Sequence, residues 1–187
     1  MGLDISIGVD NYEDVFDENY HQNDDENFNK HSLSRTFCNF ICRKEVIETE
    51  AELDQIGKIV GVDISAIYEM ENYVDIEELA EYIDEDELEV EIIKAEVNNT
   101  KLEGNIKKVL NTVSELISKL NEIENLQKLL LKTEFDTLNN DEYFSSFTID
   151  KGKGYIDNNF GQDLRNFKNF LEYCLKRETK TVWFVYG

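Results

Sequence analysis

Proline is absent from the 187 residues of this chain, although average usage of about 5% would place about nine in a chain of this length. Nothing in the chain therefore requires proline's fixed backbone angle, and the composition favours long helices joined by turns at Gly or Asn. Cysteine is scarce as well, because Cys38, Cys42 and Cys174 are the only three. Three cysteines exclude a framework of paired disulfides and are typical of a reducing compartment, so we expect a cytoplasmic protein.

Long hydrophobic runs are also missing. No apolar stretch approaches the roughly eighteen residues that a membrane span requires. Residues 1–4 carry an acid where a secretory signal needs positive charge. We therefore expect neither secretion nor a membrane partner.

Basic residues are scarce in the first hundred positions. Residues 1–100 contain 28 acidic and 6 basic residues, whereas residues 101–187 contain 13 of each, so the net charge of −22 lies in the first part. A nucleic-acid-binding surface needs Lys and Arg to displace counterions from phosphates, and an acidic surface is repelled by anionic lipid. The charge therefore excludes direct binding of nucleic acid or of an anionic membrane, and it suits a basic protein as partner.

Apolar side chains are present in sufficient number for a core, since 41% of the residues are hydrophobic, with 11 Phe and 9 Tyr. Residues 3–9 alternate apolar with small or polar side chains, and residues 181–186 form a strongly β-prone run. Apolar residues recur at helical spacing between these two segments. We expect one α+β domain over 1–187, mostly helical, whose small sheet pairs the N- and C-terminal strands.

Three further segments organise that domain. Residues 10–30 are rich in Asp, Glu and Asn and predict an acidic loop. Ser32 or Ser34 can cap a following helix, and Gly61 can end another over 53–60. Residues from about 50 to 131 predict an inserted acidic helical region that contains a long helix or a helical hairpin.

A heptad seam is the longest pattern in the sequence, with apolar residues at alternating steps of four and three from Leu88 to Ile123. A continuous helix over 87–131 would be roughly 65 Å long, too long for a compact domain without a partner. A Thr and Glu capping-box pair beginning within residues 98–100, together with Gly104, favours a break. An exposed seam would instead predict a homodimer. The residues of the seam that would form it are Leu102, Ile106, Val109, Val113, Leu116 and Leu120.

The acidic run over 84–91 is unlike an ordinary solvated helix face, which mixes charges because Glu and Lys four residues apart stabilise each other. From Glu45 to Glu96 there are 19 acidic residues, and the only basic ones are Lys58 and Lys94. Two interpretations stay open: the charge serves solubility, or it forms a surface that meets a basic groove as nucleic-acid phosphates do. The candidate interaction surface consists of Asp84, Glu85, Asp86, Glu87, Glu89 and Glu91.

A polar cluster beside the first strand is the candidate small-molecule site. Asp4 lies in that strand, and His31 and Arg35 follow across the acidic segment, so the three predict a pocket near the strand. The chain has two His and no serine nucleophile elbow, which argues against hydrolytic chemistry. A small-molecule-binding or enzymatic α+β domain stays the alternative to a protein that acts by binding another protein.

Two more motifs are better explained by packing. His31, Cys38 and Cys42 have a spacing that could place ligands around a metal ion, with His21 or an acid as the only source of a fourth. However, there is no C-x-x-C motif, and Cys38 lies in an apolar stripe. The helix-turn-helix spacing over 53–68 has no Lys or Arg in its second helix, where DNA recognition would need them. We therefore expect no metal, no cofactor and no nucleic-acid contact from these segments.

Three stretches resemble small uncharacterised proteins of bacteriophages and prophages: the opening MGLDISI, residues 160–173 (FGQDLRNFKNFLEY) and the ending VWFVYG. The resemblance covers the ends of the chain and not its acidic middle. Such proteins have no agreed activity, so the resemblance implies a phage-type context and no particular chemistry. In that context the acidic half suggests a non-enzymatic inhibitor that mimics DNA and binds a basic host protein, for example a defence nuclease.

Overall fold

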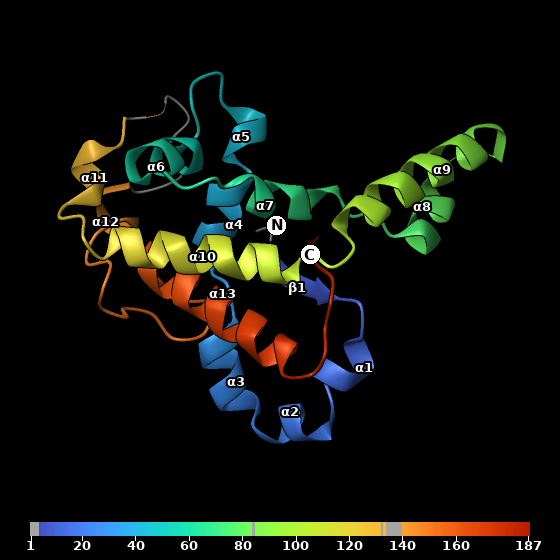
Figure 1. Ribbon diagram of the computed structural model, residues 1–187, viewed down its shortest axis with the longest axis horizontal. Coiled ribbons are helices and arrows are strands. Elements are labelled where there is room, and N and C mark those ends of the chain that lie inside the picture. Colours follow the sequence, from blue (N-terminus) through green and yellow to red (C-terminus); the bar gives the residue numbers. More distant parts are fainter. Residues whose placement is uncertain (1–3, 84, 132, 134–139) are drawn as a thin grey trace.

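The computed structural model describes residues 4–83, 85–131, 133 and 140–187 of the chain (Figure 1). It confirms a mostly helical α+β fold with one small sheet. The elements in chain order are β1 (Ile5–Val9), α1 (Tyr12–Val15), α2 (Glu18–Gln22), α3 (Asp24–His31), α4 (Arg35–Ile41), α5 (Arg43–Val46), α6 (Glu52–Val60), α7 (Ser65–Glu69), the 3₁₀ turn η1 (Met70–Asn72), α8 (Ile76–Tyr82), α9 (Glu85–Leu102), α10 (Ile106–Leu120), α11 (Leu126–Leu129), α12 (Asn140–Tyr143), α13 (Phe160–Leu175) and β2 (Val182–Tyr186).

The sheet joins the two ends of the chain, as the sequence predicts. β1 and β2 pair antiparallel, with Ile5 opposite Tyr186 and Val9 opposite Val182. The alternating residues Ile5, Ile7 and Val9 of β1 are buried, because successive side chains of a strand point to opposite faces. One face of the small sheet therefore closes the core.

The part of the heptad seam from Leu102 to Leu120 is buried inside the chain. α10 and α13 lie side by side (Figure 1), and the face of α10 that meets the core carries the seam. Each of the six seam residues is at most 2% exposed: Leu102, Ile106, Val109, Val113, Leu116 and Leu120. These side chains pack against the chain's own core, so they are not available to a second copy of the protein.

The long helical pattern breaks at Gly104 and not at residues 98–100, which stay helical within α9. Gly104 has a φ of +74°, a left-handed conformation that glycine adopts without steric cost. The next residue, Asn105, donates from Nδ2 to the Val182 carbonyl at 2.8 Å and accepts from the Val182 N–H at 2.9 Å. The turn therefore places the start of α10 against β2, and this tertiary contact fixes the break.

The prediction of an acidic loop over residues 10–30 was wrong, because α1, α2 and α3 occupy most of it. The acidic residues begin these helices: Asp17 caps α2 by accepting from the Tyr20 N–H at 2.8 Å. Aromatic side chains then anchor the segment, as the Phe16 ring stacks on Phe170 of α13 with centroids 5.9 Å apart. Tertiary packing of this kind stabilises helices too short to form alone.

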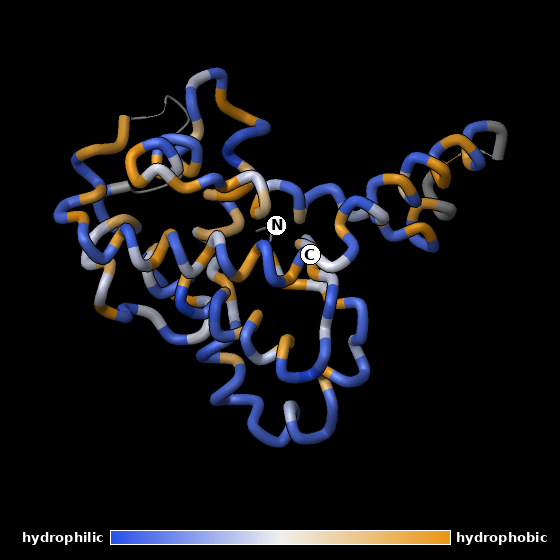
Figure 2. The backbone as a smooth tube through the Cα atoms, viewed as in Figure 1, coloured by the Kyte–Doolittle hydropathy of each residue, from blue (hydrophilic) through white to orange (hydrophobic). Residues whose placement is uncertain are grey.

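The expected insertion over about 50–131 is divided between the body of the molecule and a projection. α6, α7 and α10 contribute to the common core, whereas α8 and α9 extend away from the body as a helical pair (Figure 1). We call residues 75–102 the arm. Apolar segments alternate with hydrophilic ones along it (Figure 2). In the part of the chain that the structure describes, no helix combines the length and apolar character needed to cross a membrane.

Candidate functional site

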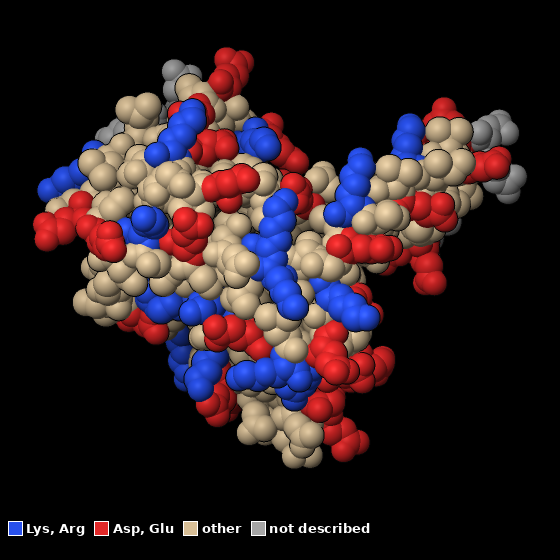
Figure 3. Space-filling view, viewed as in Figure 1, with Lys and Arg blue, Asp and Glu red and all other residues tan. Residues whose placement is uncertain are grey.

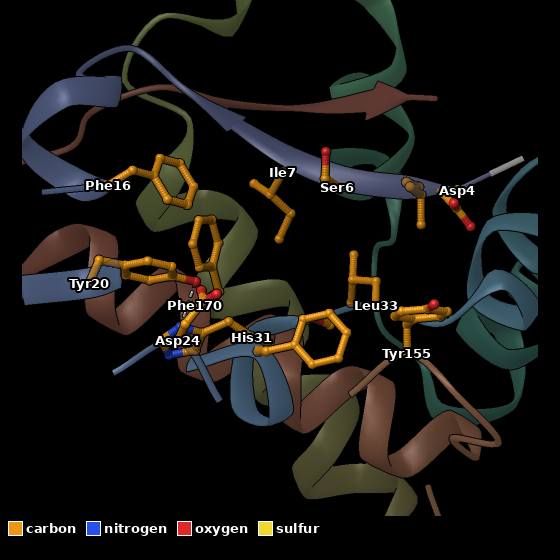
Figure 4. Close-up of a pocket in the computed structure, with 13 residues that line it drawn as sticks. Asp4, Ser6, Ile7, Phe16, Tyr20, Asp24, His31, Leu33, Tyr155 and Phe170 are labelled. Atoms are coloured by element: carbon orange, nitrogen blue, oxygen red, sulfur yellow. Dashed lines mark hydrogen bonds between the residues drawn. The ribbon is translucent and has the colours of Figure 1, made fainter. Parts of the chain in front are cut away.

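A pocket of about 300 Å³ lies between β1, α3 and the turn that precedes α13 (Figure 4). Asp4 and His31, two of the three residues expected there, line it. Arg35 does not line the pocket but binds Asp4, with its Nε 2.6 Å from Asp4 Oδ1 and its Nη2 3.3 Å from Oδ2. The structure therefore brings the three predicted residues to one place, with Arg35 in a supporting position.

Aromatic side chains form much of the pocket wall, which the sequence pattern does not reveal. Figure 4 shows Phe16, Tyr20 and Phe170 at one end of the space and Tyr155 at the other, below β1. The aromatic residues that line it are Phe16, Tyr20, Phe28, Tyr155 and Phe170. They come from segments far apart in the chain, so only the tertiary fold assembles them.

One wall depends on a glycine. Phe28 of α3 meets Tyr155 edge to face, with ring centroids 5.4 Å apart at 90°. Gly154 has a φ of +65°, and a Cβ added there would lie 2.2 Å from Cε1 of Phe28. Because no other residue leaves that space empty, Gly154 lets the Phe28 ring approach the turn that carries Tyr155.

His31 is a neutral member of the pocket. Its Nδ1 lies 3.2 Å from the Tyr20 hydroxyl, and the two rings stack with centroids 5.8 Å apart. Burial, helped by the nearby charges of Lys30 and Arg177, lowers the pKa of His31 to about 4. The imidazole therefore adds no positive charge to the pocket at neutral pH.

The charged groups that line the pocket are acidic. Asp4 and Asp24 lie at opposite ends of it (Figure 4), and its lining includes no Lys or Arg from the described residues. The hydrogen bond from Arg35 holds the pKa of Asp4 below its usual range. Asp24 makes no ion pair with a cation in the described part of the chain, so its carboxylate is the available negative charge.

A buried carboxylate, Asp163, is the polar centre that sequence reasoning missed. It is fully buried in the first turn of α13 and accepts four hydrogen bonds. Oδ1 accepts from the Ser34 N–H at 3.0 Å and from Asn158 Nδ2 at 2.9 Å; Oδ2 accepts from the Ser34 hydroxyl at 2.6 Å and from the Tyr143 hydroxyl at 2.9 Å. Burial raises the pKa of Asp163 to about 6 despite these bonds.

The Asp163 cluster ties α4, α12 and the start of α13 together. Of the two caps that the sequence offers, Ser32 and Ser34, it is Ser34 that caps α4, by accepting from the Phe37 N–H at 3.1 Å. A Ser at a helix start and an Asp in the first turn of a helix are both common. Nothing in the local sequence therefore indicates that Ser34 and Asp163, 129 positions apart, form a hydrogen bond. Because Asp163 is enclosed and its oxygens are satisfied, it holds the fold together and does not face a ligand.

The predicted acidic surface is only partly described. Asp84 lies outside the described residues, and so do the side chains of Glu85 and Asp86. Glu87 and Glu89 are exposed on α9, and Glu91 forms an ion pair with Lys94. Acidic side chains follow the arm in Figure 3, where basic ones lie along one edge.

An exposed apolar stripe lies on the same helix. Val90, Ile93 and Val97 are 55%, 54% and 50% exposed. Their spacing of three and four residues places them on one face of α9. The opposite face carries Ala95, which is 2% exposed, and Asn99. The Asn99 side chain accepts a hydrogen bond from the Val74 N–H and donates one to the Val74 carbonyl. α9 therefore packs on the chain by one face and presents a second apolar face to solvent.

The remaining candidates do not form sites. Cys38 and Cys174 are buried, and burial raises the pKa of each thiol to about 12, which disfavours the thiolate needed for reactivity or metal binding. His31 is occupied by the Tyr20 contact. Among the residues that the structure describes, no three His, Cys, Asp or Glu side chains gather as metal ligands would.

Known proteins do not add to this picture. Comparison of the chain with models of protein families, with curated proteins and with solved structures found no match in any of the three. The pocket beside β1 and the apolar stripe of the arm are therefore the two surfaces from which function is inferred. They lie in different parts of the molecule (Figure 1).

Proposed function

We propose that this protein acts by binding a basic protein partner through the arm. The observation that carries the proposal is the apolar stripe of Val90, Ile93 and Val97, which is half exposed on a helix that projects from the body. A single exposed aliphatic residue is ordinary on a protein surface. Three at positions i, i+3 and i+7 have the spacing with which a helix docks into an apolar groove.

The charge of the arm selects the partner. Residues 75–102 contain eleven acidic and two basic residues, a net charge of −9. Glu89 and Glu96 lie along one side of the stripe, and on the other side Lys94 is neutralised by Glu91. A second copy of the arm would bring like charges together, whereas a groove with a Lys and Arg rim would complement them.

The proposal extends to the kind of protein bound. A groove that is basic at its rim is the surface with which nucleic-acid-binding proteins hold phosphates. An arm that fills such a groove would block the nucleic acid by mimicry. The phage-type resemblance of the chain ends supports a host protein of this class, for example a defence nuclease, as the partner.

The stripe supplies a measurable share of the affinity. Burying the exposed half of each of its three side chains contributes about 1 kcal/mol, so the stripe adds about 3 kcal/mol, or about 100-fold in affinity. A suitable probe is a fluorescein-labelled helical peptide with Leu on one face and Lys on the other. Its affinity for the protein is measured by fluorescence anisotropy over a range of salt concentrations.

The variant Ile93→Asp separates docking from simple charge attraction. It removes an apolar anchor and at the same time makes the arm more negative, so docking predicts a loss of about tenfold or more, because a carboxylate would be buried against the Leu face of the peptide. The control Ile149→Asp adds the same charge at a residue 63% exposed on the body and should leave affinity unchanged. If Ile93→Asp binds the peptide as tightly as the wild type or more tightly, charge alone attracts it and the docking proposal fails.

A further inference from the structure

The pocket beside β1 has walls suited to one kind of charge. Aromatic rings carry negative potential on their faces, and five aromatic residues line this pocket. Phe28 and Tyr155 keep 43% and 39% of their surface exposed at its mouth, so a ligand can cover them. Such a wall favours a positively charged guest over a negatively charged one.

The charged groups point to the same guest. Asp24 lies at one end with no cationic partner among the described residues, and Asp4 lies at the other end, paired with Arg35, which does not line the pocket. An anion would meet two carboxylates and no cation lining the space. His31 is held neutral by burial, so it does not repel a cation at neutral pH.

The size of the pocket limits the guest to a small molecule. Its volume of about 300 Å³ lies at the lower end of the range of ligand pockets, roughly 300–1,000 Å³. Ile7 and Leu33, which also line the pocket, offer apolar contact and no directed hydrogen bond from their side chains. A compact alkylated ammonium group matches these three properties: positive charge, apolar surface and small volume.

We propose that the pocket between β1 and α3 is a binding site for a small organic cation of the alkylammonium type, held by the aromatic walls and by the carboxylate of Asp24. This site is separate from the arm, so it does not depend on the partner proposed above. The rings supply selectivity for the alkylated charge, and Asp24 supplies longer-range attraction.

The test titrates the purified full chain with tetramethylammonium, choline and benzyltrimethylammonium, followed by amide shifts in NMR spectra. We expect at least one of the three to bind with a Kd below roughly 1 mM at about 150 mM salt, and to shift amides of Ile7 and Ser32. The neutral isostere of choline, 3,3-dimethyl-1-butanol, should bind at least about tenfold more weakly than choline.

Two matched pairs of variants separate the pocket from general attraction of cations to an acidic surface. Phe28→Leu changes no charge and should weaken choline about threefold to tenfold, while Tyr12→Leu, at a ring 60% exposed and outside the pocket lining, should have no effect. Asp24→Asn should weaken choline, and Asp25→Asn, which removes the same charge from the same helical turn, should not.

Three results would overturn the inference. None of the three cations binds; or the neutral isostere binds as well as choline, which would make the pocket a plain apolar site; or Asp24→Asn and Asp25→Asn weaken binding equally while Phe28→Leu does nothing. The last result would mean that the acidic surface attracts cations without a pocket.

Discussion

The buried carboxylate of Asp163 should make the folded protein less stable as the pH rises through about 6. Burial raises its pKa from 3.8 to about 6, and its four hydrogen bonds offset only part of the cost of burying the charge. At a pH between these two pKa values, Asp163 is protonated in the folded chain and ionised in the unfolded chain. The stabilisation is therefore complete below the unfolded pKa and disappears as the pH rises past the folded pKa.

The size of the effect follows from the shift. A rise from 3.8 to about 6 corresponds to about 3 kcal/mol in full, of which about 1.4 kcal/mol is lost between pH 5 and pH 7.5. The lower limit of pH 5 keeps the protein away from its pI of about 4.3, where a net charge near zero favours precipitation.

The substitution Asp163→Asn removes the titratable carboxyl group and keeps the shape of the side chain. The amide oxygen can accept from the Ser34 N–H and from Asn158, as Oδ1 does. The amide nitrogen can donate to the hydroxyls of Ser34 and Tyr143, which then turn from donors to acceptors. The variant should therefore fold, with the carboxylate's pH dependence removed.

Urea unfolding of both proteins from pH 5 to pH 7.5, followed by the fluorescence of Trp183, measures the difference in free energy of unfolding. We expect the wild type to lose about 1.4 kcal/mol relative to Asp163→Asn over this range. Asp150→Asn, which alters an ion pair at a side chain 63% exposed, is the control and should show no such trend. A constant difference, or one that grows in favour of the wild type with rising pH, would refute the reasoning.

Three further changes test the packing. Val113→Asp should unfold the chain, because the side chain is fully buried and the charge should lower the free energy of unfolding by more than about 4 kcal/mol. Circular dichroism would show the loss of helix. A variant that stays folded and only dissociates from a dimer would contradict this. Gly8→Val should cost about 1–3 kcal/mol in thermal unfolding, because a Cβ at Gly8 would lie 2.3 Å from the indole Nε1 of Trp183. Gly154→Ala should cost about 1–2 kcal/mol and displace Phe28, visible as NMR shifts around the pocket.

The terminal sheet was predictable because its signals are local. Residues 3–9 alternate in polarity at the strand period, and residues 181–186 are β-prone throughout, so each strand is evident in its own segment. The register, with Gly8 opposite Trp183, was not predictable. It depends on the indole covering a residue without a side chain, which is a contact between the two ends of the chain.

The errors occurred where tertiary contacts outweigh local preference. Residues 10–30 are rich in Asp, Glu and Asn, so the sequence predicts a loop. Their helices form because rings such as Phe16 pack against Phe170, which is distant in the sequence. The break in the long helix was expected near residues 98–100, but Asn105 fixes it by pairing with β2. In both places the deciding partner is distant in sequence.

The candidate pocket was half predictable for the same reason. Asp4 and His31 could be selected from the sequence because they are polar residues near a predicted strand, and in the structure both line the same pocket. Phe28 and Tyr155 are ordinary aromatic residues in the sequence, and only the approach permitted by Gly154 makes them a wall. Residue type thus indicated where a pocket lies, and the fold determines which chemistry its walls favour.

The charges of the acidic half do not all have the same surroundings. In the segment of residues 10–30 the acids lie mainly at the starts of helices, where they cap N–H groups and favour the helix dipole, so local structure accounts for them. On the arm, Glu89 and Glu96 lie inside a long helix, beyond its first turn, where neither role applies. They border the exposed Val90 and Ile93, which also oppose solubility. Local structure is therefore a sufficient explanation for the first group, and the second group is the part of the acidic half that we propose to meet a partner.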